Sequence, residues 1–292
     1  MVSFIGGRLV SLLATTLVAS MVVFLLMQVL PGDPALVILG MNAEPDTIAA
    51  LHKQLGLDQP LWFRYIDWIG GFFVGDFGDS ITYSVPISEL LGPRIMVTVP
   101  LALLSMLISV VIAVAIGVYA AANRGKTGDT VAMGIAQIGV AIPNFWLALL
   151  LILLFALKLA WFPASGFAGW QDGIWNGFRS LILPALALGL PLAAILGRVT
   201  RSAVIETLGE DFIRTARAKG LTRNGALWKH AVPNALIPVV TIIGLQFSFL
   251  LAGTIIIENV FFLPGVGRLV FQAIAQRDLV TVQSLVTLLA AS

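Results

Sequence analysis

Long uncharged stretches alternate with short polar stretches along the 292 residues of the chain. Five of the long stretches contain no Asp, Glu, Lys, Arg or His, namely 9–30, 95–123, 130–157, 180–197 and 231–257. An α-helix rises 1.5 Å per residue, so about 20 apolar residues cross the hydrocarbon core of a bilayer, which is roughly 30 Å thick. With a sixth apolar run at 280–291, the pattern predicts an all-α integral membrane protein with six transmembrane helices.

Prolines and run lengths indicate where these helices end or bend. The run 31–34, which reads PGDP, should end the first span. Pro143 and Asn144 interrupt the third stretch, for which we expect a kinked span. The sixth run has only twelve residues and reaches about 18 Å as a helix. We therefore expect the sixth helix to be incomplete here and further residues to follow Ser292 in the native protein.

The segment 31–94 differs from the rest of the chain because it is polar and acidic. Its composition and spacing predict a small extracytoplasmic segment with one helix at about 46–55, which Gly56 should end, and a second helix at about 61–73. The second helix is rich in Trp, Phe and Tyr, which favours a position on the bilayer surface. The chain is thus divided into the N-terminus and first span (1–30), the extracytoplasmic segment (31–94) and a transmembrane core (95–292).

One polar segment, 198–233, lies between two uncharged stretches and holds seven of the seventeen Lys and Arg residues. Its spacing predicts a helix over 206–219. One face of this helix carries apolar residues and the other carries charged ones: Leu208, Phe212 and Ala216 against Glu210, Arg214 and Arg217. Glu210 and Arg214 lie one turn apart and can form an ion pair.

A glycine turn should follow this first helix. Gly220 comes after a basic last turn and is expected to end the helix as a left-handed residue. Thr222 should cap a second short helix over 223–230, and Pro233 should end it because proline has no N–H to donate. The outward side chains of the second helix would be Leu227 and Trp228. The segment is thus predicted to fold as helix, glycine turn, helix.

The composition, with 59% hydrophobic and 11% charged residues, is far more apolar than that of a soluble domain. No Cys is present, which excludes disulfides and Cys-ligated metal. The tripeptide 125–127 reads GKT, but it follows a predicted membrane helix where a phosphate-binding loop requires a strand, and Ala120 stands where that loop requires Gly. The sequence therefore predicts no enzyme, no metal site and no cofactor in this chain, and a net charge of +2 is too small to indicate nucleic-acid binding.

Basic residues are distributed unevenly between alternate sides of the membrane. If Arg8 is cytosolic, its side holds ten Lys and Arg residues against four acidic residues, whereas the other side holds seven against eleven. Short cytoplasmic loops carry an excess of Lys and Arg. The distribution therefore places the N-terminus and the segment 198–233 in the cytosol.

The segment 198–233 resembles the EAA loop of ABC-importer permeases, in which a short helix docks into a cleft on the ATPase subunit. The stretch 214–216, which reads RTA, occupies the EAA positions, although the general motif has Glu where this chain has Arg. Gly220 takes the place of the motif's glycine, and 230–233, which reads HAVP, takes that of its closing segment. Four further sequence stretches extend the resemblance to the dipeptide, oligopeptide and nickel importer branch over nearly the whole chain: LPGDP, LGLDQP, GDFGDS and ENVFFLPGVGRL.

This resemblance implies a type I ABC importer permease that forms half of a transmembrane pathway for di- or oligopeptides or a related small solute. The implied partners are a second homologous permease, two cytosolic ATPase subunits that bind ATP and Mg, an extracytoplasmic solute-binding protein and membrane lipid. The implied location is the bacterial cytoplasmic (inner) membrane. The ATPase-coupling residues would be Glu210, Asp211, Arg214, Thr215, Ala216, Arg217, Gly220, Leu227, Trp228, His230 and Pro233.

Other interpretations stay open at this point. The segment 198–233 also fits a basic surface helix on anionic lipid, and less well a DNA-binding helix-turn-helix, which would lack a third helix. For the whole chain, the alternatives are a stand-alone secondary carrier or channel and a non-transporting scaffold. The uncharged spans disfavour an ion-coupled carrier, which usually keeps ionisable groups at membrane depth. The candidates for the pathway, each also explained by helix packing, are Gln137, Asn144 and Gln246.

Overall fold

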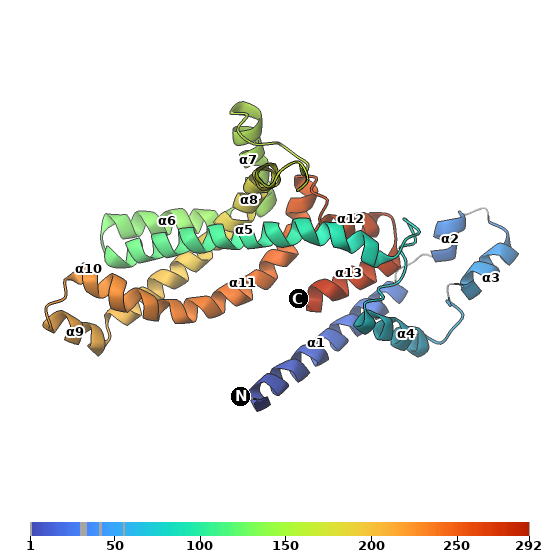
Figure 1. Ribbon diagram of the computed structural model, residues 1–292, viewed down its shortest axis with the longest axis horizontal. Helices are drawn as coiled ribbons and strands as arrows, with labels where there is room; N and C mark the ends of the chain where they lie inside the picture. Colours follow the sequence, from blue (N-terminus) through green and yellow to red (C-terminus); the bar gives the residue numbers. More distant parts are fainter. Residues whose placement is uncertain (1, 30–33, 41–42, 55, 292) are drawn as a thin grey trace. The chain divides into compact units, whose positions relative to one another are not determined.

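The computed structural model describes residues 2–29, 34–40, 43–54 and 56–291, which Figure 1 shows to be largely helical. Along the chain the elements are α1 (Val2–Val29), α2 (Pro34–Leu39), α3 (Pro45–Gln54), α4 (Leu61–Val74), α5 (Ile87–Ala122), α6 (Thr127–Ala141), α7 (Asn144–Leu151), the π-helical turn η1 (Ile152–Lys158), α8 (Ile174–Leu208), α9 (Asp211–Ala218), α10 (Arg223–Ala226), the π-helical turn η2 (Leu227–Ala231), α11 (Val232–Val260), α12 (Val266–Ala275) and α13 (Leu279–Ala291). No β-strand occurs in the described ranges, where one isolated bridge joins Asp79 and Pro86.

Four helical segments of the described chain are long and apolar enough to cross a membrane: Gly6–Val29 within α1, α5, α8, and the continuous helix Arg223–Val260. A fifth crossing is added if α6 acts with α7 and η1 as one broken span. The helices α12 and α13 are apolar but shorter. The prediction of an all-α membrane protein is confirmed, whereas the count of six spans is not.

The break between α6 and α7 follows from the geometry of proline. The helix α6 ends at Ala141, and Ile142 is extended (φ −82°, ψ 123°), because the ring of a following proline disfavours helical backbone at the residue before it. Pro143 then stands directly before α7. The predicted kink is confirmed, and the two helices are bent by 102°.

Three spans extend beyond the uncharged stretches. The helix α5 begins at Ile87, α8 covers Ile174–Leu208, and α11 continues to Val260. The added end of α11 includes Glu258, whose fully buried carboxylate accepts a hydrogen bond from Thr98 Oγ1 at 2.6 Å. Charged residues are compatible with helical backbone, so the end of an uncharged stretch marks the expected membrane boundary and not the end of the helix.

The two helices predicted within 31–94 are confirmed as α3 and α4. The helix α4 ends at Gly75, which adopts left-handed backbone (φ 85°) and donates its N–H to the carbonyls of the last turn. The predicted stop of the first span at 31–33 and the end of the first helix at Leu55 lie outside the described residues.

Two compact units make up the chain, one formed by 1–97 with 265–292 and the other by 98–264. In the first unit, α1 packs on α13 and α4, and α12 packs on α13. The apolar core of this unit consists of Ile87, Leu91, Val266, Leu269, Val270 and Leu285.

A buried carboxylate fixes the turn that follows α4 in the first unit. Asp278 Oδ2 accepts hydrogen bonds from Ser80 Oγ at 2.5 Å and from the Thr82 N–H at 3.2 Å. Six residues further along the chain, within α13, Ser284 Oγ donates to the Phe77 carbonyl at 2.7 Å. These contacts satisfy buried polar groups and hold the turn against the start of α13.

The helix α8 lies at the centre of the second unit and packs on α11, α6 and α7. A glycine allows its close approach to α5: a Cβ added at Gly189 would lie only 2.8 Å from the Ser105 carbonyl oxygen. Pro184 and Pro191 lie inside α8 without ending it, and internal prolines are tolerated in membrane helices.

Candidate functional site

The polar segment 198–233 is broken where the sequence predicts one helix. The helix α8 ends before Gly209, Glu210 is extended (φ −69°, ψ 150°), and α9 begins at Asp211. The prediction of a helix over 206–219 is therefore wrong. Glycine is the weakest helix former after proline, and an acidic residue is favourable in the first turn of the new helix, so both residues favour a break at this point.

The break changes which side chain of α9 faces the protein. Ile213 is only 2% exposed, whereas Phe212 is 44% exposed, so the predicted apolar face through Leu208, Phe212 and Ala216 is wrong. Ile213 packs in a cluster with residues of α5, α8, α10, η2 and α11, namely Val118, Ala121, Val204, Ala226, Leu227, Ala231, Val232 and Ala235. One buried side chain thus fixes α9 to the long helices and leaves Phe212 outside.

The turn between α9 and α10 has the predicted form. Gly220 has φ 95°, in the left-handed region, and the Leu221 N–H donates to the Ala216 carbonyl at 3.2 Å. Thr222 Oγ1 then accepts a hydrogen bond from the Gly225 N–H at 3.1 Å and caps α10. The predictions of a left-handed glycine and of a threonine cap are both confirmed.

Pro233 does not end the helix that Thr222 begins, contrary to the prediction. The chain continues from α10 through η2 into α11, and Pro233 is the second residue of α11. In an α-helix a proline ring clashes with the carbonyl four residues earlier. The wider π-helical turn directly before Pro233 relieves this constraint.

Leu227 and Trp228, which were expected to face outward together, face opposite ways. Leu227 is 5% exposed and belongs to the same buried cluster as Ile213, whereas Trp228 is 59% exposed. Of the other predicted coupling residues, Ala216 and His230 are half-buried, and the exposed ones are Glu210, Asp211, Arg214, Thr215, Arg217, Gly220 and Pro233. Leu227 therefore stabilises the segment and is not accessible to a partner.

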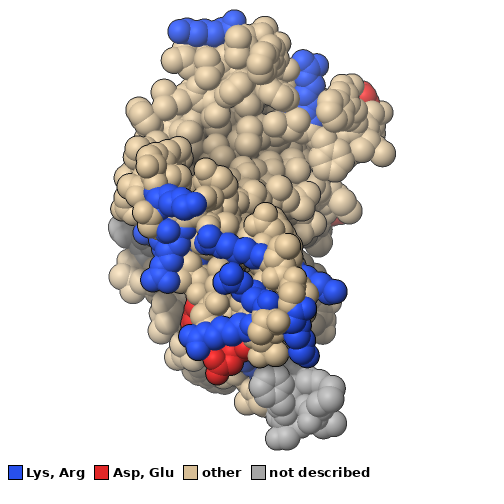
Figure 2. Space-filling model, turned by 90° about the vertical axis from the view of Figure 1, so that its left-hand side faces the viewer, with Lys and Arg blue, Asp and Glu red and all other residues tan. Residues whose placement is uncertain are grey.

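Charged side chains cover much of the outer surface of this segment. Arg214 Nη1 lies 3.2 Å from Asp211 Oδ1 and not against Glu210 as predicted, because the break leaves Glu210 outside α9. Both side chains are exposed, so the pair adds little to stability. Figure 2 faces the end of the second unit that carries α9 and α10, where basic side chains gather. The exposed basic residues between α9 and the start of α11 are Arg214, Arg217, Lys219, Arg223 and Lys229.

Two arginines, one on each side of α9, hold the turn between α5 and α6. Arg201 Nε and Nη2 donate to the two carboxylate oxygens of Asp129 at 2.6 and 2.7 Å, and this carboxylate also accepts from the Gly125 N–H at 3.0 Å. Arg223 Nη2 donates to the Ala122 carbonyl at 3.0 Å. None of these contacts was predicted from the sequence. The sequence feature that could have indicated the Arg201 contact is Asp129 itself. An acidic residue at the edge of an uncharged stretch requires a cationic partner.

The three pathway candidates lie on different elements of the second unit. Gln137 is on α6, where its Oε1 accepts a hydrogen bond from Arg198 Nη1 at 3.2 Å. Asn144 is the first residue of α7, and its Nδ2 would lie 4.0 Å from a Cβ added at Gly253 of α11. Gln246 is half-buried on α11. A pathway role for the three residues stays a prediction.

The chemistry of segment 198–233 suits docking. Its outer face offers aromatic rings and charged side chains, and its inner face is apolar and buried. No group of three or more His, Cys, Asp or Glu side chains that could hold a metal ion occurs in the part of the chain that the structure describes.

Known proteins resemble this chain along its whole length. Residues 113–292 match the family described as binding-protein-dependent transport system inner membrane component, and residues 1–87 match the N-terminal family of such membrane components. The putative peptide transport system permease protein of Brucella abortus is 42% identical over 283 residues, which cover 97% of this chain and 90% of the relative. The glutathione transport system permease protein of Salmonella typhimurium is 41% identical over 288 residues, which cover 99% of this chain and 92% of that relative.

These matches agree with the all-α architecture and with the apolar helices described above. The first family match alone covers more than half of the chain. This family consists of membrane permeases of transport systems, and such permeases are not enzymes. The chain therefore belongs to the family of inner membrane components of binding-protein-dependent transport systems.

Proposed function

We propose that this permease subunit forms half of the transmembrane pathway of an ATP-driven importer for di- or oligopeptides or a related small solute. Its partners are a second homologous permease, two cytosolic ATPase subunits and an extracytoplasmic solute-binding protein, all acting at the lipid of the bacterial cytoplasmic membrane. ATP and Mg are bound by the ATPase subunits. One observation carries the proposal: Ile213 anchors α9 in the permease while Phe212 stays on its outer side.

The outer face of segment 198–233 suits a protein partner. Aromatic side chains are enriched in protein interfaces, and Phe212 and Trp228 are the large apolar side chains that this segment exposes. The charged side chains around them supply a polar rim. When the ATPases close, α9 moves with them and carries along the end of α8 and the turn held by Arg201 and Arg223. The spans would thereby alternate between outward-facing and inward-facing states.

Orientation is part of the proposal, with the N-terminus and segment 198–233 in the cytosol and 31–94 outside. The native chain has no Cys, so single cysteines report topology without further changes. We expect an impermeant thiol reagent to label Asp79→Cys in intact cells and to leave Asn224→Cys unlabelled until the membrane is opened. The reverse result would invert the proposed topology.

The proposed solute class comes from the relatives, of which one is named for peptide transport and another for glutathione transport. Glutathione is itself a short peptide. A stand-alone carrier or channel would be active when the subunit is purified alone, and a scaffold would be inactive in every combination. Co-purification with an ATPase, together with ATP-dependent uptake of a peptide in vesicles, separates the importer from both alternatives.

The variant Gly220→Val tests the docking function of the segment. A β-branched residue in left-handed backbone costs about 1–2 kcal/mol locally, which is enough to turn α10 relative to α9 and too little to unfold the long helices. In vesicles with the partner subunits, we expect substrate-stimulated ATP hydrolysis and uptake to fall together. The amount of membrane-inserted permease should stay near that of the parent.

The lipid-surface alternative predicts a different ranking of variants. Binding to anionic lipid depends on summed charge and apolar area and tolerates a local change of direction. Arg217→Gln combined with Lys219→Gln should then reduce transport more than Gly220→Val does. If Gly220→Val transports like the parent while the charge-neutralised variant fails, the docking function has to be abandoned.

A further inference from the structure

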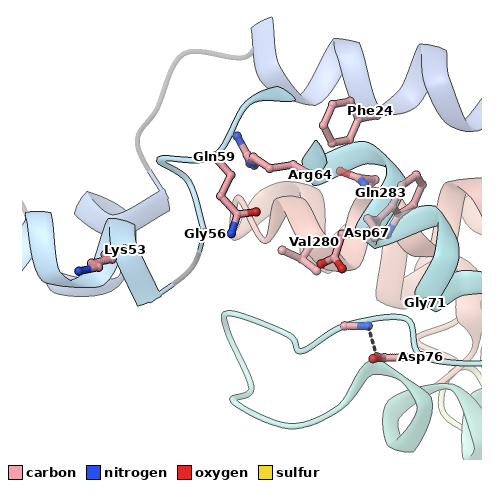
Figure 3. Close-up of a pocket in the computed structure, with 12 residues that line it drawn as sticks. Phe24, Lys53, Gly56, Gln59, Arg64, Asp67, Gly71, Asp76, Val280 and Gln283 are labelled. Carbon is pink, nitrogen blue, oxygen red and sulfur yellow. Dashed lines mark hydrogen bonds between the residues drawn. The ribbon is translucent and has the colours of Figure 1, made fainter. Parts of the chain in front are cut away.

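The first unit contains a cavity of about 490 Å³ that lies outside segment 198–233. It is formed by α4, the turn after α4, the chain before α4, the start of α13 and one residue of α1. Its volume falls in the range of small-molecule sites, which is about 300–1,000 Å³. Figure 3 shows the Arg64, Asp67 and Gln283 side chains grouped beside α4 and α13 at this cavity, with Lys53 apart from them.

The Gln283 side chain is the strongest sign of a ligand. It is 8% exposed and lines the cavity, yet its carboxamide has no hydrogen-bond partner among the described residues. A carboxamide offers two donors and one acceptor, which are available here to a ligand that enters the cavity. A peptide group presents one N–H donor and one carbonyl acceptor, which is the complement of the Gln283 carboxamide.

Two opposite charges stand one turn apart on α4 at the same cavity. Arg64 donates from Nη1 to Gln28 Oε1 at 3.2 Å, and partial burial lowers the pKa of its guanidinium without removing the charge. Asp67 lines the cavity without an ion pair or hydrogen bond to any described residue. Side chains three residues apart on a helix have Cβ atoms about 5–6 Å apart. The cavity therefore presents a half-buried cation and an exposed anion from neighbouring turns of one helix.

We propose that this cavity binds a short peptide with free termini. Asp67 accepts hydrogen bonds from the peptide's ammonium group, Arg64 donates to its carboxylate, and Gln283 bonds its peptide group. Extended residues span about 3.3–3.6 Å each, so the charged ends of a dipeptide lie roughly 7 Å apart, a distance that two long side chains from neighbouring turns of α4 can bridge. Trp68 and Val280 supply apolar contact beside these polar groups. The site rests on the proposed function only in that peptide must be present on the side of the membrane that 31–94 faces.

Equilibrium dialysis with radiolabelled alanylalanine measures this binding directly. The sample is the full permease complex with its ATPases in lipid nanodiscs, without the solute-binding protein. We expect saturable binding by the parent complex. N-acetylated alanylalanine and alanylalanine amide should each bind at least about tenfold more weakly, because each loses a charge-assisted hydrogen bond.

Substitutions in the cavity should change this discrimination in a pattern that misfolding cannot produce. Asp67→Asn should remove the preference for a free ammonium and keep the preference for a free carboxylate, and Arg64→Gln should do the converse. Gln283→Leu keeps a similar volume and should weaken all forms about tenfold. The matched controls Asp79→Asn and Gln276→Leu, which are exposed and outside the cavity, should bind like the parent.

The outcomes separate this site from the transport function. A parent complex that imports peptide with its binding protein but shows no saturable alanylalanine binding in dialysis overturns the cavity proposal and leaves the transport function standing. Binding without discrimination against the blocked peptides also overturns it. A complex that imports no peptide yet binds alanylalanine with the expected discrimination supports the cavity and refutes the peptide solute.

Discussion

Two connecting segments of this permease are fixed by different chemistry. In the first unit, the turn after α4 is held by Asp278 and Ser284, whose short side chains are buried with their hydrogen-bond partners. In the second unit, the segment 198–233 is held by Ile213 and by long arginine side chains such as Arg201, which reach across to the turn between α5 and α6.

The difference indicates what each connection does. Short buried side chains with several hydrogen bonds allow a single geometry, because every small displacement leaves a buried polar group without a partner. Arginine side chains are flexible and partly solvated, so they can keep a contact while the backbone moves. The turn after α4 is thus a fixed part of its unit, and the segment 198–233 is suited to move together with the turn that it holds.

Removal of the Asp278 carboxylate should give the largest effect. Asp278→Ala leaves the Ser80 hydroxyl and the Thr82 and Thr281 N–H groups without an acceptor in a buried region, which should cost about 3 kcal/mol. We expect a lower midpoint of thermal unfolding in detergent, with unfolding measured by tryptophan fluorescence. The control Asp79→Ala removes an exposed carboxylate of the same turn and should change stability by at most about 0.5 kcal/mol. Equal midpoints for both variants would contradict the fixed-turn interpretation.

The neighbouring residues Ile213 and Phe212 separate anchoring from docking. Ile213→Ala removes a buried side chain and should cost about 2 kcal/mol of stability, together with weaker association with the ATPase. Phe212→Ala should leave the unfolding midpoint unchanged and still weaken that association, because its ring lies outside. The measurements are thermal unfolding and retention of the ATPase subunit during purification. Retention of the ATPase by Phe212→Ala at the level of the parent would argue against docking on this face.

The ion pair of Arg201 with Asp129 should have the smallest effect on stability. Asp129→Asn weakens a bidentate contact that is partly exposed on the arginine side, which should cost about 1 kcal/mol. The ratio of solute imported to ATP hydrolysed should fall more clearly than stability does, because the held turn no longer follows the segment 198–233. The exchanged pair Asp129→Arg with Arg201→Asp should restore part of this ratio. A ratio unchanged in Asp129→Asn would show that the contact is only structural.

Local rules made several features predictable from the sequence. Gly220 is left-handed and Thr222 caps a helix because these preferences depend on one or two neighbouring residues. The bend at Pro143 likewise follows from steric constraints on the residue before proline. The helical membrane class follows from the long uncharged stretches, whose length is a one-dimensional property of the chain.

The missed features depend on contacts between distant parts of the sequence. The choice of Ile213 over Phe212 as the buried residue depends on the break at Gly209, because a single interrupted turn shifts the whole face of α9. The pairing of Arg201 with Asp129 joins residues 72 positions apart, and no local pattern connects them. The burial of Gln283 likewise becomes apparent only when α13 packs against α4 and the turn after it.

The π-helical turn η2 adds a residue to the helix Arg223–Val260 and leaves the direction of the docking face almost unchanged. A π-helical turn holds more residues than an α-helical turn, in which each residue adds about 100° of rotation. The residues Leu227–Ala231 therefore turn the helix by roughly as much as four α-helical residues would. One residue inserted into the α-helical start of α11 has no such compensation and would rotate α10, α9 and Phe212 by about 100° around the axis of α11. The direction of the docking face thus depends on the number of residues along this helix and on where its turns are π-helical.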